Sequence, residues 1–225
     1  MSYQISAFTD SLKRTPRELF NPWFHHDREH DKSPESPAIR KRQLEAYLTE
    51  RSNRARFLFI AEALGYQGGH FTGMAMTSER ILLGHQEKGY GVRPDHVFQS
   101  IEPERTSRLD VNPNGMSEPT ATIMWGTLVE LGLDPYDVVL WNAVPWHPWH
   151  PDKGLLSNRT PNSVEMKAGL RHLKAFLQLF PNARVIAVGK KCEQSLTGIG
   201  VPHTCVRHPA NGGAPKFRSQ VKDLI

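Results

Sequence analysis

Four short, largely apolar runs, partly β-branched, recur along the 225-residue chain. They occupy residues 57–61, 137–142, 184–189 and 203–208. Apolar runs of this length are typical of strands that are buried on both faces of a parallel sheet. The pattern therefore predicts four buried strands.

Amphipathic patterns lie beside these runs, with apolar residues recurring every three or four positions. Their apolar faces consist of Leu44, Tyr47 and Leu48; of Ala121, Met124, Leu128 and Leu131; and of Leu170, Leu173, Leu177 and Phe180. Helices that alternate with strands predict an α/β fold in which a parallel sheet is covered on both faces. Nothing divides the chain into two hydrophobic halves, so we expect a single domain over residues 1–225.

The first 37 residues differ from the rest, because they are polar and rich in proline. Within the stretch FNPWFHHDREHDKSPESP, a few aromatic residues such as Phe20, Trp23 and Phe24 are suited to anchor the segment. Prolines and short polar residues interrupt regular structure. We therefore predict an extended N-terminal arm over residues 1–37.

Three polar residues stand at the ends of the predicted strands. Glu62 follows the first run, Asn142 ends the second and His208 closes the fourth. Taken singly, such a carboxylate is typical of a solvated turn, the amide of a turn contact and the histidine of a structural role. The carboxyl ends of parallel strands, however, lie at one edge of the sheet, where ligands bind. The three residues together therefore predict a functional site.

The charge of the chain favours an anionic partner. Lys and Arg number 28 against 23 Asp and Glu, which gives a net charge of +5. A basic surface suits nucleic acid, although an excess of this size also occurs in proteins that bind none. No apolar stretch approaches the roughly 20 residues that span a bilayer, and the N-terminus lacks the apolar core of a signal peptide. We expect a cytoplasmic protein that does not bind membranes.

No metal or cofactor is predicted. Cys192 and Cys205 cannot supply the four thiolates of an iron–sulfur cluster or of an all-cysteine zinc site. Two histidine-rich stretches, at residues 25–31 and 147–151, lack the regular spacing of metal ligands. The glycines at residues 65–69 are not followed by Gly-Lys-Ser or Gly-Lys-Thr, so a nucleoside-triphosphate loop is not predicted either.

Three motifs together resemble the uracil-DNA glycosylase superfamily, in a branch without the iron–sulfur cysteines. They are AEALGYQGGHFTG at residues 61–73, WNAVPWHP at 141–148 and RHPANGG at 207–213, and the resemblance covers about residues 56–218. It implies a three-layer α/β/α fold with a central four-stranded parallel sheet. It also implies hydrolysis of the N-glycosidic bond of uracil, or a related deaminated base, which is flipped out of DNA and leaves an abasic site.

The resemblance also implies roles for individual residues. Glu62 and His208 match the catalytic glutamate and histidine, of which the histidine stabilises the departing base. Phe71 matches the aromatic residue that stacks on the extruded base, and Asn142 matches the asparagine that reads its edge. An asparagine amide can accept from uracil N3–H and donate to O4, whereas cytosine presents the opposite pattern.

The motifs depart from the family pattern at several positions. Ala61 replaces the usual Gly, Leu64 the Pro and Ala210 the Ser that follows the histidine and proline. Ala63 stands where the best-known branch has its catalytic aspartate, and we expect Ala63 to line the base site. Gly65 stands where a tyrosine excludes thymine in that branch, which leaves this task to Tyr66.

DNA contacts are expected from basic and aromatic residues beside the motifs. His147, between Trp146 and Trp149, is suited to lie against a base or the phosphate backbone, because aromatic and cationic groups together form a stacking groove. Lys216 and Arg218 follow the last motif and are candidates for phosphate contacts.

These expectations combine into a monomeric, monofunctional uracil-DNA glycosylase of base excision repair, acting on DNA that contains uracil and binding the resulting abasic sites. Two alternatives stay open. One is a protein of the same fold that binds lesions or abasic sites with little turnover, which the missing aspartate favours. The other is a hydrolase of small nucleosides or nucleotides, against which the basic charge and the missing phosphate loop argue.

Overall fold

The computed structural model describes residues 2–225 and is built around four parallel strands. These are β2 (Phe57–Ala63), β3 (Val138–Val144), β5 (Arg184–Val188) and β6 (Thr204–Val206), in the spatial order β3-β2-β5-β6. Residues 57–61 of β2 and the whole of β3 are buried, as expected for strands that are covered on both faces. The predicted four-stranded parallel sheet is confirmed.

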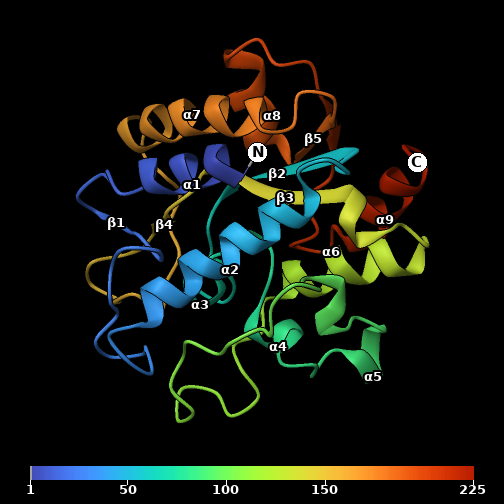
Figure 1. Cartoon of the computed structure of the whole chain (residues 1–225). Coiled ribbons are helices and arrows are strands. Elements are labelled where there is room, and N and C mark those ends of the chain that lie inside the picture. Colours follow the sequence, from blue (N-terminus) through green and yellow to red (C-terminus); the bar gives the residue numbers. More distant parts are fainter. Residues whose placement is uncertain (1) are drawn as a thin grey trace.

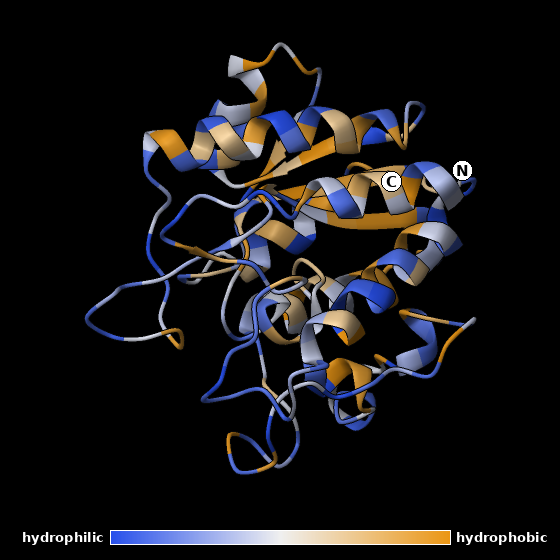
Figure 2. Cartoon of the chain, turned by 60° about the vertical axis from the view of Figure 1, so that its left-hand side comes forward, coloured by the Kyte–Doolittle hydropathy of each residue, from blue (hydrophilic) through white to orange (hydrophobic). Residues whose placement is uncertain are grey.

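Helices form a layer on each side of this sheet (Figure 1). One face is covered by the helices α7 (Ser163–Gln178) and α8 (Lys190–Gly198). The other face is covered by α2 (Ser36–Arg51) and α6 (Pro119–Glu130). The last helix, α9 (Ala214–Lys222), packs beside β6. Figure 2 shows the strands as the most hydrophobic layer, with polar residues on the outward sides of the helices. The predicted three-layer α/β/α architecture is thereby confirmed.

Shorter elements fill the long connection between β2 and β3. They are α3 (Gly69–Thr72), α4 (Glu79–Leu82), α5 (Glu87–Tyr90) and two 3₁₀ turns, Pro94–His96 and Pro135–Asp137. Between the first 3₁₀ turn and α6 the chain is irregular, and it ends at Glu118, the residue directly before α6. This irregular stretch brings Glu118 to the edge of the sheet where β2 ends.

The N-terminal segment is folded onto the core, so the predicted extended arm is wrong. It begins with α1 (Ser2–Ser11), whose buried Ile5 and Phe8 lie on the same helical face. Phe8 packs against Trp141 of β3, with 5.5 Å between the ring centroids. Further along, β1 (Leu19–Phe20) pairs antiparallel with β4 (His147–Pro148). Apolar residues spaced along this mostly polar segment, among them Ile5, Phe8 and Phe20, are buried against the rest of the protein.

The strands β2 and β5 are neighbours in the sheet, but the connections that follow them run to opposite faces. The chain leaves β2 to build α6 on one face and leaves β5 to build α8 on the other face. Ligand sites of open parallel sheets form at such a point, beyond the carboxyl ends of the strands. Within residues 2–225, no helix is both long and apolar enough to cross a bilayer.

Candidate functional site

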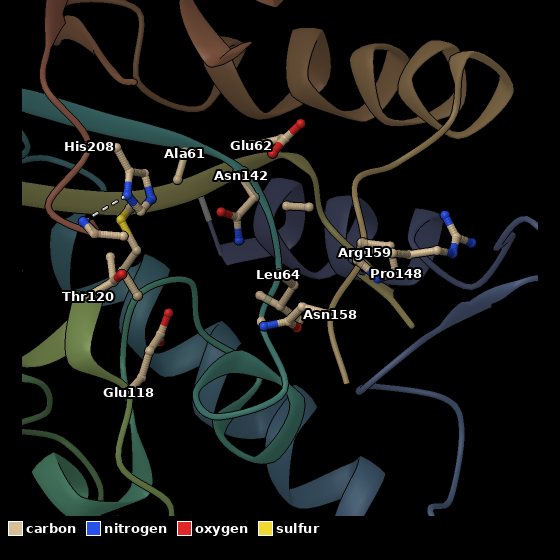
Figure 3. Close-up of a pocket in the computed structure, with 14 residues that line it drawn as sticks. Ala61, Glu62, Leu64, Glu118, Thr120, Asn142, Pro148, Asn158, Arg159 and His208 are labelled. Carbon is tan, nitrogen blue, oxygen red and sulfur yellow. Dashed lines mark hydrogen bonds between the residues drawn. The ribbon is translucent and has the colours of Figure 1, made fainter. Parts of the chain in front are cut away.

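A cavity of about 280 Å³ lies at the carboxyl ends of the strands. Its lining comes from separate parts of the chain, namely residues 61–65, Met76, Glu118, Thr120, Asn142, Pro148, residues 158–159, His208 and Ala210. Four of the residues predicted for the site meet here, Glu62, Ala63, Asn142 and His208. Figure 3 shows Asn142 and His208 beside one space with Glu62 at its rim, although these residues come from separate parts of the sequence.

His208 follows β6 and is held in one orientation by its own loop. Its Nδ1 accepts a hydrogen bond from the backbone N–H of Ala210 at 3.1 Å. Gly189, with φ of 92°, lets the loop approach, because a Cβ there would stand only 3.0 Å from the Cβ of His208. Burial, together with the charge of Arg207, lowers the pKa of His208. A neutral ring that accepts at Nδ1 carries its proton on Nε2, where it can donate to a ligand.

Glu62 is the penultimate residue of β2, and its side chain is 28% exposed at the rim of the cavity. Its Oε1 lies 3.4 Å from Nζ of Lys191, which begins α8 together with Lys190. Lys191 also donates to Oγ1 of Thr160 at 2.8 Å. The carboxylate therefore stands at the mouth of the cavity with a lysine beside it.

Asn142 lies inside β3 and is directly opposite Ala61 of β2. Its residue is 2% exposed, and its Oδ1 is buried without a hydrogen-bond partner among the described residues. The small side chain of Ala61 leaves the amide facing the cavity. An unpaired buried amide oxygen costs about 1–3 kcal/mol, so this atom is suited to receive a donor from a ligand.

Glu118 also lines the cavity, and no sequence pattern pointed to it. Its residue is partly exposed, but Oε2 is buried and has no hydrogen-bond partner among residues 2–225. Burial raises the pKa of this carboxyl to about 7. In the sequence Glu118 looks like a solvated residue before a helix that starts with proline, and that position gives no sign of burial.

Asn158 and Arg159 complete the wall from the loop before α7. The Oδ1 of Asn158 accepts from the backbone N–H of Tyr66 at 3.1 Å. Arg159 forms two hydrogen bonds with the carboxylate of Glu165, at 2.6 and 2.7 Å. Glu165 in turn belongs to the capping box of α7 with Asn162. The loop is thus fixed by its own helix, a relation that polar turn residues do not reveal in a sequence.

Two residues that were expected to contact the base are not part of the cavity lining. Phe71 is fully buried, 4.4 Å from the ring of His70, and does not line the cavity. Tyr66 is also absent from the lining, and only its backbone contributes, through Asn158. Among the described residues no Phe, Tyr or Trp side chain lines this cavity, and its apolar walls are Leu64, Met76 and Pro148.

His147 was expected to touch DNA, and the structure contradicts this. The residue has no exposed surface, and its Nε2 lies 2.7 Å from the carbonyl oxygen of Ser157. Its Nδ1 lies 3.1 Å from Nδ1 of His70. Burial, aided by the neighbouring His70, lowers the pKa of His147 to about 3. A buried and neutral imidazole cannot serve as a phosphate contact.

The two predicted phosphate contacts at the C-terminus differ in position. Lys216 is exposed and lines a depression beside the cavity. The Nε of Arg218, in contrast, lies 3.5 Å from Oε2 of Glu130 at the C-terminal end of α6. Since α6 rises about 1.5 Å per residue, its 12 residues separate Arg218 from the cavity by roughly 18 Å. The structure therefore places Arg218 away from the site.

Basic residues border the cavity on one side. A second depression shares Glu62 and His208 with the cavity and adds Lys190, Lys191 and Arg207. A third shares Lys190 and Arg207 with the second and adds Lys216. The three depressions form a continuous path, along which the cationic side chains follow one another.

The donor set does not resemble a metal centre. Within the described residues, no group of three or more His, Cys, Asp or Glu side chains is arranged to hold a metal ion. Cys192 is buried, and burial raises the pKa of its thiol to about 12. The chemistry available in the cavity is that of imidazole, amide and carboxyl groups, together with the guanidinium of Arg159 in its wall.

Together these features define a three-layer α/β/α protein with a polar binding site at the ends of its strands. A sequence model described as the Uracil DNA glycosylase superfamily matches residues 49–222. The chain belongs to this superfamily, and membership supports a glycosylase enzyme that acts on DNA. The comparison with curated proteins found no match.

Proposed function

We propose that the protein is a monofunctional DNA glycosylase that hydrolyses the N-glycosidic bond of uracil flipped out of DNA. The observation that carries the proposal is the convergence of His208, Asn142 and Glu62 on one cavity, in a member of the superfamily. A base inside a duplex cannot be reached, so it must rotate into a pocket of this kind. The product is DNA with an abasic site.

Asn142 reads the edge of the base. Its unpaired Oδ1 accepts from N3–H of uracil while the amide donates to O4. Cytosine has an acceptor and an amino group at these positions, so it would leave buried groups unpaired. Discrimination of this type reaches roughly 10⁴.

His208 stabilises the departing base. Cleavage leaves negative charge on the base, mainly on its carbonyl oxygens. Because Ala210 occupies Nδ1, the proton on Nε2 is available to donate to the O2 oxygen. A fixed donor of this kind is typically worth about 3 kcal/mol in the transition state.

Glu62 acts on the sugar side of the bond. Its carboxylate stabilises the positive charge that develops on the sugar and orients the attacking water, as carboxylates do in glycoside hydrolysis. The Nζ of Lys191, 3.4 Å from Oε1 of Glu62, holds the carboxylate in place. Leu64 and Met76, rather than Phe71, supply the apolar faces against which the base packs.

The basic path outside the cavity receives the DNA backbone. Lys190, Lys191, Arg207 and Lys216 line the two adjoining depressions, and phosphates are positioned by such side chains without reading sequence. This arrangement favours a polymer over the small nucleoside of the alternative hydrolase. Binding therefore weakens with salt, by about one unit of log–log slope for each phosphate contact.

The proposal is tested by single-turnover excision of uracil from an oligonucleotide, followed by alkaline cleavage of the abasic product. His208→Ala and Glu62→Ala are expected to slow the chemical step by roughly 10² to 10⁴ while DNA affinity changes little. Exposed residues provide matched controls, His85→Ala and Glu130→Ala, which should excise at the unmodified rate.

Two results would overturn the proposal. If the unmodified protein binds uracil DNA without releasing the base, it is a lesion-binding protein of the same fold. If His208→Ala and Glu62→Ala both excise at the unmodified rate, the assignment of these residues is wrong.

A further inference from the structure

Glu118 is the one carboxyl of the cavity that is not explained by the roles above. It directly precedes α6 but makes no side-chain cap hydrogen bond to that helix, whose first residue is Pro119. Its Oε2 is buried and unpartnered instead. A residue at this position normally stabilises the helix start, so its side chain is turned away from its usual partner.

The chain makes room for this carboxyl. A Cβ at Gly68 would lie 1.9 Å from Oε2 of Glu118, closer than any side chain allows. At Gly65 a Cβ would lie 3.6 Å from Oε1, in ordinary contact. The carboxyl thus lies over the glycine turn that follows β2, in a space that a larger residue at position 68 would fill.

Figure 3 shows the carboxyl of Glu118 and the amide of Asn142 directed into the same space. Both carry a buried oxygen without a partner among residues 2–225. A buried polar atom without a hydrogen-bond partner costs about 1–3 kcal/mol. Two such atoms in one cavity indicate a ligand that bonds to both.

No charged group in the cavity neutralises Glu118. Arg159 is bound to Glu165, and Glu62 lies beside Lys191. His208 is neutral, and the elements packed around Glu118 otherwise contribute Gly65, Gly68, Thr120, Asn142 and Asn158. Burial alone raises the pKa of the carboxyl to about 7, so a protonated form that donates is available near neutral pH.

We propose that Glu118 is a specificity-determining residue of this cavity, whose un-ionised carboxyl donates a hydrogen bond to a carbonyl oxygen of the extruded base beside the edge bound by Asn142. The inference rests on the proposed function, because it takes the ligand to be a DNA base. It names the substrate class as bases with a carbonyl at this edge, which include the products of deamination.

The protonation state of Glu118 sets the selectivity. The O–H of the acid matches a carbonyl oxygen, whereas an amino group at the same place would meet a second donor. Ionisation removes the donor and places a negative charge against the carbonyl oxygen. Excision of a carbonyl-bearing base therefore declines as pH rises through the pKa of Glu118.

The test compares Glu118→Gln, Glu118→Ala and the matched control Glu130→Gln, which lies at the opposite end of the same helix. Single-turnover excision of uracil is measured between pH 5.5 and 9. The unmodified protein and Glu130→Gln are expected to lose activity above about pH 7, approaching tenfold per pH unit. Glu118→Gln should be several-fold slower at pH 6 but lack this decline, because its amide donates at every pH. Glu118→Ala should be 10- to 100-fold slower.

A second measurement separates this inference from the proposed function. Affinity is measured at pH 6 for DNA with a non-cleavable 2′-fluoro-deoxyuridine and for DNA with an abasic analogue. The unmodified protein should prefer the uracil analogue about tenfold more than Glu118→Ala does. If no protein excises uracil but the unmodified protein keeps this preference, the proposed glycosylase activity is wrong. Binding of the base by Glu118 is then still supported.

The inference is overturned by either of two results. One is an alkaline decline in Glu118→Gln equal to that of the unmodified protein. The other is a preference for the uracil analogue that is the same in Glu118→Ala and the unmodified protein. Thermal unfolding of each variant shows that the comparison is made between folded proteins.

Discussion

Two groups of buried polar side chains adjoin in this protein, and they differ in whether their hydrogen bonds are complete. In the first, which we call the Asp27 cluster, Asp27 Oδ2 lies 2.9 Å from His70 Nε2 and 2.8 Å from His30 Nδ1. His70 in turn contacts His147, which contacts Ser157. In the second, the cavity, Glu118 and Asn142 keep unpartnered oxygens.

The Asp27 cluster holds the chain around the cavity in place. Asp27 comes from the N-terminal segment, His70 from α3 and His147 from β4. The ring of Phe20 stacks on His70, with 4.1 Å between centroids. The cluster ends at the carbonyl oxygen of Ser157, and the next residue, Asn158, lines the cavity. Complete hydrogen bonding thus fixes the walls, while incomplete bonding inside the cavity leaves atoms for a ligand.

The same chemical change, from carboxyl to amide, therefore has opposite effects on the stability of the two groups. The larger effect is expected for Asp27→Asn, which weakens the bonds to His70 and His30. Hydrogen bonds to a charged group are worth about 1.5–3 kcal/mol, so the free energy of unfolding should fall by about 3 kcal/mol at pH 7. Urea denaturation measures the change, and exposed Asp152→Asn is the matched control.

The acid sensitivity of the protein checks the same assignment. Burial would raise the pKa of Asp27, but the bonds to His70 and His30 hold it far below its usual range. A lowered pKa contributes stability above about pH 4, the unfolded value, and that stability is lost as pH falls further. The loss between pH 4 and 2 should be smaller in Asp27→Asn. Equal losses of stability in both proteins would show that Asp27 does not stabilise the fold through these bonds.

The sheet and the strand-end residues were predictable because each leaves a local signal. Buried parallel strands appear as continuous apolar runs, and Glu62 and Asn142 interrupt such a pattern with polar groups. His208 belongs to the last of three motifs, which together resemble the superfamily. The carboxyl ends of parallel strands meet at one edge, so these residues had to lie near one another.

The rest depends on contacts between distant segments, which a single sequence does not encode locally. Ile5 and Phe8 look like isolated apolar residues until α1 packs on the core. His147 looks like a surface histidine until His70 covers it. Glu118 is buried only because the glycine turn after β2 passes beside it. In each case a partner far along the chain decides burial, and burial decides the chemistry.

A gain in stability, smaller than the loss at Asp27, is expected for Glu118→Gln. The pKa of Glu118 is raised from its ordinary value near 4.5 to about 7, so the folded protein is penalised for ionising it. The contribution of un-ionised Glu118 to the free energy of unfolding is therefore complete below about pH 4.5, and it is lost as pH rises to 7. Water in the open cavity reduces the penalty, so we expect the variant to gain about 1–2 kcal/mol at pH 8 and nothing at pH 4.5.

Urea denaturation at these two pH values checks the sign, with exposed Glu130→Gln as the control. A loss of stability in Glu118→Gln at pH 8 would mean that the carboxylate is stabilised by the protein, as Asp27 is. The contrast between the closed cluster and the open cavity would then be wrong.

The smallest effect on stability is expected at the surface, for Lys191→Ala, which belongs to neither buried group. Lys191 is 56% exposed and pairs with Glu62 at 3.4 Å, and an exposed ion pair contributes less than about 1 kcal/mol. If Lys191 also contacts a phosphate, its loss should lower the salt dependence of DNA binding by about one unit of log–log slope. Fluorescence anisotropy across a salt series measures that slope, and Lys88→Ala on α5, exposed and without a role in the cavity, should keep it. An unchanged slope in Lys191→Ala would show that this lysine serves Glu62 alone, and that the basic path begins at Lys190.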